Sequence, residues 1–272
     1  MPGFHTVVVN RVSGACGFTV NTVAGRRGYF MKAEKRERVA AIVLAAGSGR
    51  RMGSNIKKQY MQIGEREVIY YSLKAFENSL VDEVVLVVSP GDVHYCQKEI
   101  VDKYGFAKVS HIVEGGRERY HSVTIGLSQI SDCDYIFIHD GARPLVSEEI
   151  IERAFSCVRK HKACVVGMPV KDTIKIADEE GNIASTPNRN LTWLVQTPQT
   201  FEFSLIKKAY SSLMEKEEEL KNAGLVITDD AMVVETMTGH KVRLIEGSYE
   251  NIKITTPEDI ITAENFLKLR KV

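Results

Sequence analysis

The chain has 272 residues, of which 44% are hydrophobic and 26% are charged, and its formal net charge is +1. This length and composition predict a protein with a buried core, organised as one large domain or two small ones. The balanced charge argues against a nucleic-acid partner, which usually requires a broad basic surplus. The sequence contains no apolar run long enough to cross a bilayer. Its five cysteines lack C-x-x-C spacing, which favours reduced cytoplasmic thiols over a disulfide framework or a zinc site.

The first part of the chain lacks the periodicity of a helix or a strand. We expect residues 1–38 to be a leader outside the fold, either disordered or produced by an upstream start site. Met31 begins a charged stretch that leads directly into the first predicted strand. A targeting peptide is the alternative, because the segment bears arginines and has no acidic residue before Glu34. The remainder, 39–272, is expected to form one domain.

From Val39 onward, short apolar runs alternate with helical periodicity. The runs predict buried strands over 39–46, 83–89, 111–114, 135–140 and 163–170. Helices are expected over 68–79, 93–104, 122–130 and 147–161, from residue 203 onward, and after 256. Ser122 and Ser147 are the expected N-caps, and Thr256 with Pro257 can start the last helix. Repeated strand–helix alternation predicts an α/β fold with a mostly parallel, doubly wound sheet.

The pattern changes near Lys171. Two β-like runs flank the turn DEEGN at 178–182, which predicts a projecting β-arm over about 171–196. A two-stranded hairpin with so little apolar alternation is not stable alone in water. We therefore expect a second subunit to order the arm.

Candidate site residues follow the predicted strands, where open parallel sheets bind their ligands. The glycine-rich turn AAGSG at 45–49 would let backbone N–H groups approach an anion. Four cations follow this turn, namely Arg50, Arg51, Lys57 and Lys58. The alternative is a tight turn before a solvated basic helix. The clustering of the cations favours a phosphate site.

Three further segments add chemistry at predicted strand ends. In GGRERYHSV (115–123), Ser122 is a helix cap whose hydroxyl could also meet a ligand. In HDGARP (139–144), Asp140 is a candidate ligand for a ribose hydroxyl or a metal, and Arg143 could hold a phosphate. Lys253 ends a predicted strand and adds another cation. Because no trustworthy Ser-His-Asp order and no G-x-S-x-G elbow accompany them, these groups suit transfer at phosphorus.

Seven motifs in order resemble the 2-C-methyl-D-erythritol 4-phosphate cytidylyltransferase family, over residues 39 to about 269. They are LAAGSGRRMG…KKQ, GGRERYHSVTIGL, HDGARP, KDTIK, QTPQTF, TDDA and GSYENIKITTPEDI. The resemblance implies a Rossmann-like nucleotide-diphospho-sugar transferase fold and a cytoplasmic homodimer joined through the β-arm. It implies transfer of CMP from CTP to 2-C-methyl-D-erythritol 4-phosphate, a step of non-mevalonate isoprenoid precursor synthesis. The products are 4-diphosphocytidyl-2-C-methyl-D-erythritol and pyrophosphate, and the cofactor is Mg²⁺ or another divalent cation.

The same resemblance assigns roles to residues that match the motifs. Arg51, Lys58 and Lys253 would stabilise charge at the α-phosphorus as catalytic residues. The CTP site would comprise Ala45, Ala46, Gly47, Ser48, Gly49, Gly116, Ser122 and Asp140. The polyol phosphate would contact Arg143, Thr173, Arg189 and Thr197, with Thr173 and Arg189 coming from the arm of the neighbouring subunit. The metal would be held mainly by the CTP phosphates, close to Asp140.

Alternatives remain at this stage. Ribitol-5-phosphate cytidylyltransferase of teichoic acid synthesis shares most of these motifs, and other nucleotidyltransferases of the fold share some. The arm sequences KDTIK and RNLTW favour the methylerythritol enzyme. A regulatory or binding protein that retains only the cleft would be expected to lose Arg51, Lys58 or Lys253, and all three are present.

Overall fold

The computed structural model describes residues 36–47 and 56–270. Its contacts divide the chain into two units, Met1–Glu37 and Arg38–Val272, and every element named below belongs to the second. The predicted leader lies almost wholly outside the described residues and stays a prediction. No helix in the described part of the chain is long and apolar enough to cross a bilayer.

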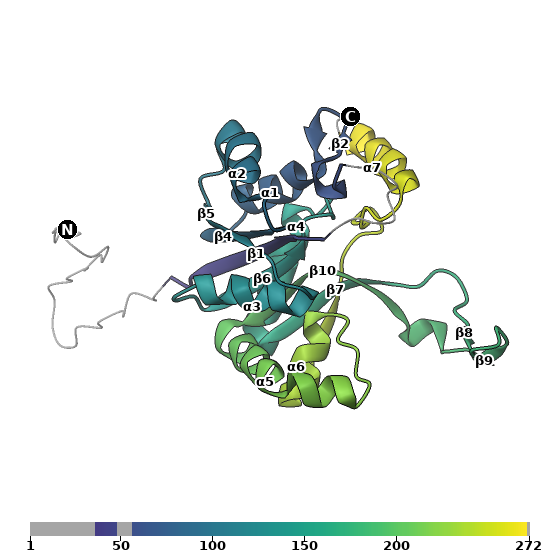
Figure 1. Cartoon of the computed structure of the whole chain (residues 1–272). Coiled ribbons are helices and arrows are strands. Elements are labelled where there is room, and N and C mark those ends of the chain that lie inside the picture. The colour runs from purple at the N-terminus through teal and green to yellow at the C-terminus, as the bar shows by residue number, and fades with distance from the viewer. Residues whose placement is uncertain (1–35, 48–55, 271–272) are drawn as a thin grey trace, which may run out of the picture. The chain divides into compact units, whose positions relative to one another are not determined.

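The second unit is built on a seven-stranded sheet with the order β11-β7-β10-β6-β1-β4-β5 (Figure 1). All neighbouring strands are parallel except β10, which is antiparallel to both β6 and β7. The predicted α/β fold with a mostly parallel sheet is therefore confirmed. The strands are β1 (Val39–Ala45), β4 (Glu83–Val88), β5 (Val109–Glu114), β6 (Tyr135–Asp140), β7 (Ala163–Pro169), β10 (Trp193–Glu202) and β11 (Arg243–Glu246).

Helices cover both faces of this sheet, since alternate residues of β1 enter two separate cores. Ala41 and Val43 pack in one core with residues of α1, η3 and α4. Ala40 and Ile42 pack in the other with residues of α3, α5 and α6. The helices of the first face are α1 (Val68–Asn78), α2 (Val93–Tyr95), the π-helix η3 (Cys96–Asp102) and α4 (Glu148–His161). Those of the second are α3 (Arg119–Gln129), α5 (Phe203–Asn222) and α6 (Asp230–Thr238).

Local sequence explains where most of these helices begin and which face they bury. The three- and four-residue spacing of Ile69, Leu73 and Phe76 turns all three toward the core, as predicted for α1. The side chain of Ser147 accepts a hydrogen bond from the Ile150 amide and caps α4, also as predicted. The prediction that Ser122 caps α3 is wrong. Glu118 is the N-cap, in a capping box with His121, so Ser122 lies inside the first turn.

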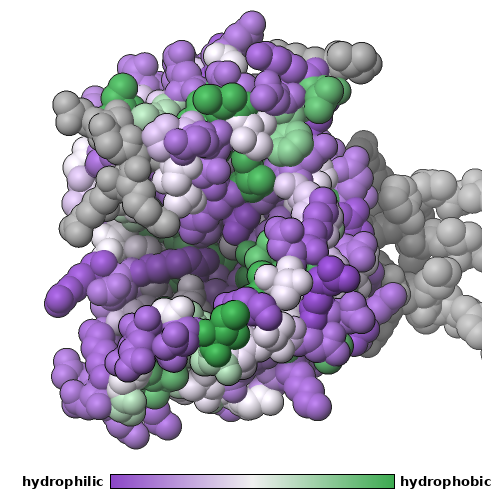
Figure 2. Space-filling view, turned by 90° about the vertical axis from the view of Figure 1, so that its right-hand side faces the viewer, coloured by the Kyte–Doolittle hydropathy of each residue, from purple (hydrophilic) through white to green (hydrophobic). Residues whose placement is uncertain are grey.

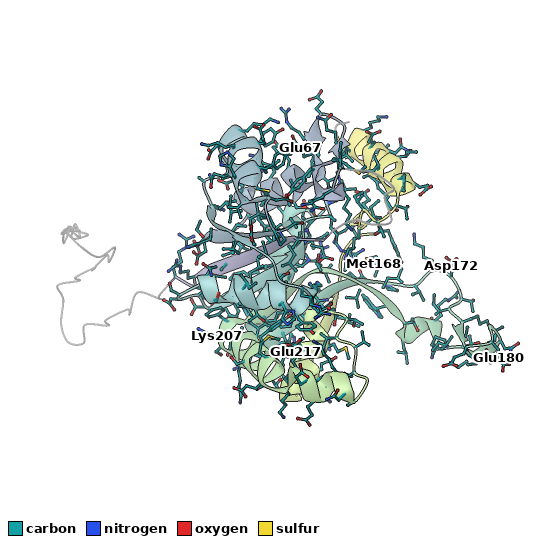
Figure 3. All side chains as sticks on the ribbon, in the orientation of Figure 1. Glu67, Met168, Asp172, Glu180, Lys207 and Glu217 are labelled. Atoms are coloured by element: carbon teal, nitrogen blue, oxygen red, sulfur yellow. The ribbon has the colours of Figure 1, made fainter. Side chains whose placement is uncertain are left out.

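The arm projects away from the sheet (Figure 1), and Asp172 and Glu180 are labelled on it in Figure 3. Its strands β8 (Ile176–Ala177) and β9 (Ile183–Ser185) pair antiparallel around the predicted turn, and the 3₁₀ helix η4 (Arg189–Leu191) follows. β10 then begins at Trp193, so the last residues of the predicted arm enter the central sheet. No strand was expected over most of β10, whose apolar pattern Gln196, Thr197 and Pro198 interrupt.

A third core joins the C-terminal helix α7 (Pro257–Arg270) to the small hairpin of β2 (Gln62–Ile63) and β3 (Arg66–Glu67). The 3₁₀ helix η2 (Lys58–Tyr60) precedes this hairpin, and α7 begins at Pro257 as predicted. Residues 251–255 form a loop, so the prediction that Lys253 ends a strand is wrong. The amide of Ile254 donates to the Ala142 carbonyl at 2.8 Å, and side-chain contacts hold the rest of this segment.

Candidate active site

A cavity of about 510 Å³ lies at the carboxyl ends of β1 and β6, as expected for an open parallel sheet. On the face from which the arm projects, Figure 2 shows a hollow bordered largely by hydrophilic residues. The cavity brings together residues from five separate segments of the chain. Those among the predicted site residues are Ala45, Ala46, Gly47, Lys58, Gly116, Ser122, Asp140 and Lys253. Ser48, Gly49 and Arg51 lie outside the described residues, so their predicted roles stay predictions.

The turn after β1 is held in place by side chains that bind its carbonyl oxygens. The buried Gln59 donates its amide hydrogens to the carbonyls of Ala45, at 2.6 Å, and Gly47, at 3.3 Å. The hydroxyl of Ser89 donates to the carbonyl of Ala46 at 3.1 Å. Gln59 follows Lys58 directly, so this anchoring fixes a candidate catalytic cation next to the turn.

A second glycine turn, after β5, packs against the first. A Cβ on Gly115 would lie 2.6 Å from the Ala46 Cβ and 2.7 Å from the Ser122 hydroxyl, so only glycine allows this approach. The Ser122 hydroxyl accepts a hydrogen bond from the Gly116 amide at 3.1 Å and donates to the Glu118 carbonyl at 3.3 Å. The hydroxyl of Ser122 thus shapes the cavity wall from within helix α3.

Asp140, at the end of β6, is the charged centre of the cavity. Its Oδ2 accepts a hydrogen bond from the Lys253 ammonium at 2.7 Å, and its Oδ1 lies 3.5 Å from the Nε of Arg119. Burial opposes the charged carboxylate, but Arg119 and Lys253 outweigh it and hold the pKa of Asp140 well below its usual range. The carboxylate therefore stays ionised at neutral pH.

Arg119 also binds a second carboxylate behind the cavity. Its Nη1 and Nη2 donate to the two oxygens of Asp230, both at 2.7 Å, and the hydroxyl of Tyr210 donates to Asp230 at 2.6 Å. Asp230 is completely buried, at 0% exposure. Burial disfavours the charged guanidinium, but Asp230 and Asp140 outweigh it and raise the pKa of Arg119.

The two candidate catalytic lysines come from segments nearly 200 residues apart in the chain, and both line the cavity. The ammonium of Lys58 donates to the carbonyl of Ile254, the residue after Lys253, at 2.8 Å. The loop that carries Lys253 is anchored by the buried Asn251, whose amide donates to the Thr197 carbonyl at 2.9 Å and to Gln196 at 3.1 Å. The position of Lys253 thus depends on the C-terminal loop and on β10.

Arg143 and Thr197 do not line the cavity. The guanidinium of Arg143 donates to the carbonyls of Asn251, at 2.8 Å, and Val195, at 3.3 Å. The hydroxyl of Thr197, on a residue only 4% exposed, accepts from the Asp140 amide at 3.0 Å. Both predicted substrate-binding side chains therefore bind protein groups. They hold the loop that carries Lys253 and the strand end that carries Asp140.

Thr173 and Arg189 are exposed on the arm and line no part of the cavity described above. The guanidinium of Arg189 lies 3.5 Å from the Lys171 carbonyl, within the arm itself. Within this subunit the two residues are therefore separate from the residues that line the cavity.

Sequence reasoning assigned no role to Gln59, Arg119, Asp230 or Asn251. All four lie in motifs that were noticed: KKQ, GGRERYHSV, TDDA and GSYENIKITTPEDI. A buried polar side chain needs a partner, but a sequence does not name a partner that lies 111 positions away, as Asp230 does from Arg119.

Among the residues that the structure describes, no three or more His, Cys, Asp or Glu side chains are grouped to hold a metal ion. Mg²⁺ commonly binds through one or two carboxylates together with substrate phosphates. Asp140, facing the cavity as an ionised carboxylate, fits such a site.

Comparison with known proteins agrees with this geometry. A family model for 2-C-methyl-D-erythritol 4-phosphate cytidylyltransferase matches residues 39–269. A relative of that name from Lachnoclostridium phytofermentans is 51% identical over 232 residues, which cover 85% of this chain and 97% of the relative. Another, from Alkaliphilus oremlandii, is 45% identical over 240 residues, which cover 88% of this chain and 98% of the relative.

Solved structures share the fold. The 4-diphosphocytidyl-2C-methyl-D-erythritol synthase of Anaerococcus prevotii has a TM-score of 0.72 and 33% identity, covering 85% of this chain and 96% of that one. The 2-C-methyl-D-erythritol 4-phosphate cytidylyltransferase of Thermus thermophilus has a TM-score of 0.65 and 29% identity, covering 85% and 99%. The chain belongs to the 2-C-methyl-D-erythritol 4-phosphate cytidylyltransferase family.

Proposed function

We propose that this protein transfers CMP from CTP to 2-C-methyl-D-erythritol 4-phosphate, giving 4-diphosphocytidyl-2-C-methyl-D-erythritol and pyrophosphate. The observation that carries the proposal is the cavity in which Lys58, Lys253 and Asp140 meet two close-packed glycine turns. The family match over 39–269 supports it. Relatives of that name at 45–51% identity favour it over ribitol-5-phosphate as the acceptor.

The proposed chemistry is attack by a phosphate oxygen of the acceptor on the α-phosphorus of CTP. A new P–O bond forms, the bond from the α-phosphorus to the bridging oxygen breaks, and pyrophosphate leaves in line. The nucleophile is already an anion, so the reaction needs no general base. The substrate pair carries roughly six negative charges, and at an effective dielectric constant of 20 each charge pair at 4 Å is worth about 4 kcal/mol. Lys58 and Lys253, together with Arg51, would supply the compensating positive charge.

Turns with exposed backbone would bind the nucleotide itself. The segments at 45–49 and 115–122 would bind the cytosine base and the phosphates of CTP. Asp140, which lines the same cavity, would bind the ribose. Asp140 would also hold Mg²⁺ together with the CTP phosphates, and the ion would neutralise part of their charge. Omitting the divalent cation and adding EDTA should therefore abolish turnover, while full activity in EDTA would contradict the metal assignment.

The acceptor site is proposed to lie between two subunits. Large apolar side chains stay exposed on the arm and at the start of β10, where a second copy would bury them: Ile176, Ile183, Leu191, Leu194 and Val195. In such a homodimer, Thr173 and Arg189 would reach the acceptor phosphate in the partner's cavity. Arg143 and Thr197 would support the site through the contacts they make within their own subunit. The cytoplasmic location stays a prediction.

The deciding experiment measures pyrophosphate release from CTP with methylerythritol phosphate and with ribitol 5-phosphate as separate acceptors. We expect kcat/KM to be at least a hundredfold higher with methylerythritol phosphate, because the pocket contacts set the discrimination. Equal or higher activity with ribitol 5-phosphate would overturn the choice of acceptor. Sedimentation velocity on the same sample tests the dimer, and a monomer at assay concentration would overturn the shared site.

A further inference from the structure

Asp230 is a buried carboxylate outside the cavity that no step of the proposed reaction uses. It is the first residue of α6, it is 0% exposed, and the guanidinium of Arg119 donates a hydrogen bond to each of its two oxygens. A bidentate arginine–carboxylate pair of this kind is directional as well as strong. Arg119 in turn lines the cavity and lies 3.5 Å from Asp140.

The location of Asp230 is itself rigidly determined. Asp229 caps α6 through the Met232 amide at 2.9 Å. Gln199, on the central strand β10, donates to Asp229 at 3.0 Å and accepts from the Ala231 amide at 2.9 Å. Because β10 pairs directly with β6, which ends at Asp140, the two carboxylates that flank Arg119 belong to one rigid frame. The guanidinium is held between fixed points.

The way in which Arg119 shares its nitrogens between two carboxylates determines whether the oxygens of Asp140 are available to a ligand. Arg119 gives both terminal nitrogens to Asp230, so only its Nε edge faces Asp140, at a distance 0.8 Å longer than the 2.7 Å contact of Lys253. Without the charge of Asp230, the guanidinium of Arg119 would be free to turn toward the carboxylate of Asp140. A bidentate ion pair between Arg119 and Asp140 would occupy both oxygens of Asp140, and it would compete with Lys253 and with any ligand of that carboxylate.

We propose that Asp230 is a positioning residue that acts through Arg119 and keeps the Asp140 carboxylate available for nucleotide binding and turnover. The inference rests on the proposed function, since it concerns the same cavity. It makes a specific claim about coupling: once Arg119 is replaced, the charge of Asp230 should no longer matter for CTP.

The test compares Asp230→Asn, Arg119→Gln and the double variant in the full-length chain. We expect Asp230→Asn to lower kcat/KM for CTP tenfold or more and to leave KM for the acceptor within twofold. We expect the double variant to match Arg119→Gln within twofold and to exceed Asp230→Asn at least fivefold, because the released cation is then absent. Additive losses, or an Asp230→Asn enzyme with normal kcat/KM, would overturn the proposal.

Glu217→Gln is the matched control, because Glu217 tethers the same helix α3 without approaching Asp140. On α5 (Figure 3), Glu217 accepts from Tyr120 at 2.9 Å and lies 3.1 Å from His121. Its replacement should leave kcat/KM for CTP within twofold. A loss equal to that of Asp230→Asn would show that Asp230 only holds helix α3 in place, and it would overturn the proposal. Arg119→Gln leaves the buried Asp230 carboxylate without its cation, so circular dichroism is recorded for every variant. Where either single variant does not fold, the double variant, which buries no unpaired charge, is compared with the wild type. A kcat/KM for CTP within tenfold of the wild type then supports the proposal, and a larger loss overturns it. An inactive wild-type enzyme would instead contradict the proposed function.

Discussion

Lowering the pH from 7 to 4.5 should destabilise the protein through one buried imidazole, that of His139. This residue is 0% exposed and lies on β6 next to Asp140. Its Nε2 is 3.2 Å from the Arg143 carbonyl, which can only accept, and its Nδ1 is 3.1 Å from the Thr197 hydroxyl. The proton of the neutral ring is therefore on Nε2, so Nδ1 accepts from the Thr197 hydroxyl, which itself accepts from the Asp140 amide. A proton on Nδ1 would break this chain of hydrogen bonds.

The magnitude follows from the shift in pKa. Burial, together with the nearby charge of Arg143 and against the attraction of Asp140, lowers the pKa of His139 to about 4. The imidazole of an unfolded chain titrates near 6.5. Because the folded pKa is the lower one, the stabilisation is complete above about pH 6.5 and is lost as the pH falls toward 4. The full difference is worth about 3 kcal/mol, of which about 2 kcal/mol is lost between pH 7 and 4.5.

Urea unfolding followed by circular dichroism measures this effect at fixed protein concentration, at pH 7, 6, 5 and 4.5. The His139→Gln variant is the comparison, since glutamine keeps a donor and an acceptor but does not titrate. The variant should be less stable at pH 7, because it loses the ring contact with Phe76. Its unfolding free energy should nevertheless fall by about 2 kcal/mol less than that of the wild type over this range. Equal losses in both proteins would show that His139 does not bind the proton, and the argument from burial would be refuted.

Three other predictions concern the chemistry of side chains. Replacing Lys58 or Lys253 with alanine should lower kcat about a hundredfold, or about 3 kcal/mol, and a near-normal kcat would remove that lysine from the mechanism. Arg189→Ala should raise KM for the acceptor but not for CTP, and mixing it with Lys58→Ala should restore one good site per mixed dimer; mixed dimers that recover no activity would place Arg189 in its own subunit's site. Among the described cysteines, Cys157 should react first with iodoacetamide at pH 7. The neighbouring Cys164 thiol, and then Arg243 and Lys160, lower the pKa of the partly exposed Cys157, whereas burial raises that of Cys96 to about 11. Mass spectrometry that found Cys96 labelled sooner would refute this.

The parts of the site that could be predicted are those with local signals. An apolar run followed by glycines marks a strand end, and Asp140, Lys58 and the turn at 45–47 were found in this way. The arm was found because polar, turn-rich sequence interrupts a regular alternation. These features depend on residues within a few positions of one another, so one sequence is sufficient to indicate them.

The features that were missed or wrong depend on distant partners. β10 is a central strand although Pro198 and several polar residues interrupt it, because β6 and β7 pair with it from both sides. Lys253 lies in a loop because Asn251 is bound by Gln196 and Thr197, more than 50 residues away. Tertiary contacts decided these two cases. Ser122 is the exception, because it resembles a helix cap in sequence but a local capping box of Glu118 and His121 starts the helix one turn earlier.

The anchors around the cavity are mostly amides, and the charge of the site explains why. Gln59 fixes the turn after β1, Gln196 and Asn251 fix the loop of Lys253, and Gln199 fixes the start of α6. An amide both donates and accepts hydrogen bonds without adding charge. A carboxylate in the place of Gln59 or Asn251 would attract the nearby lysines and repel a triphosphate, and at low dielectric each such interaction amounts to several kcal/mol. Neutral anchors therefore leave the positive charge of the cavity to its anionic substrates, and the buried charge of Asp230 is compatible with this arrangement only because Arg119 neutralises it.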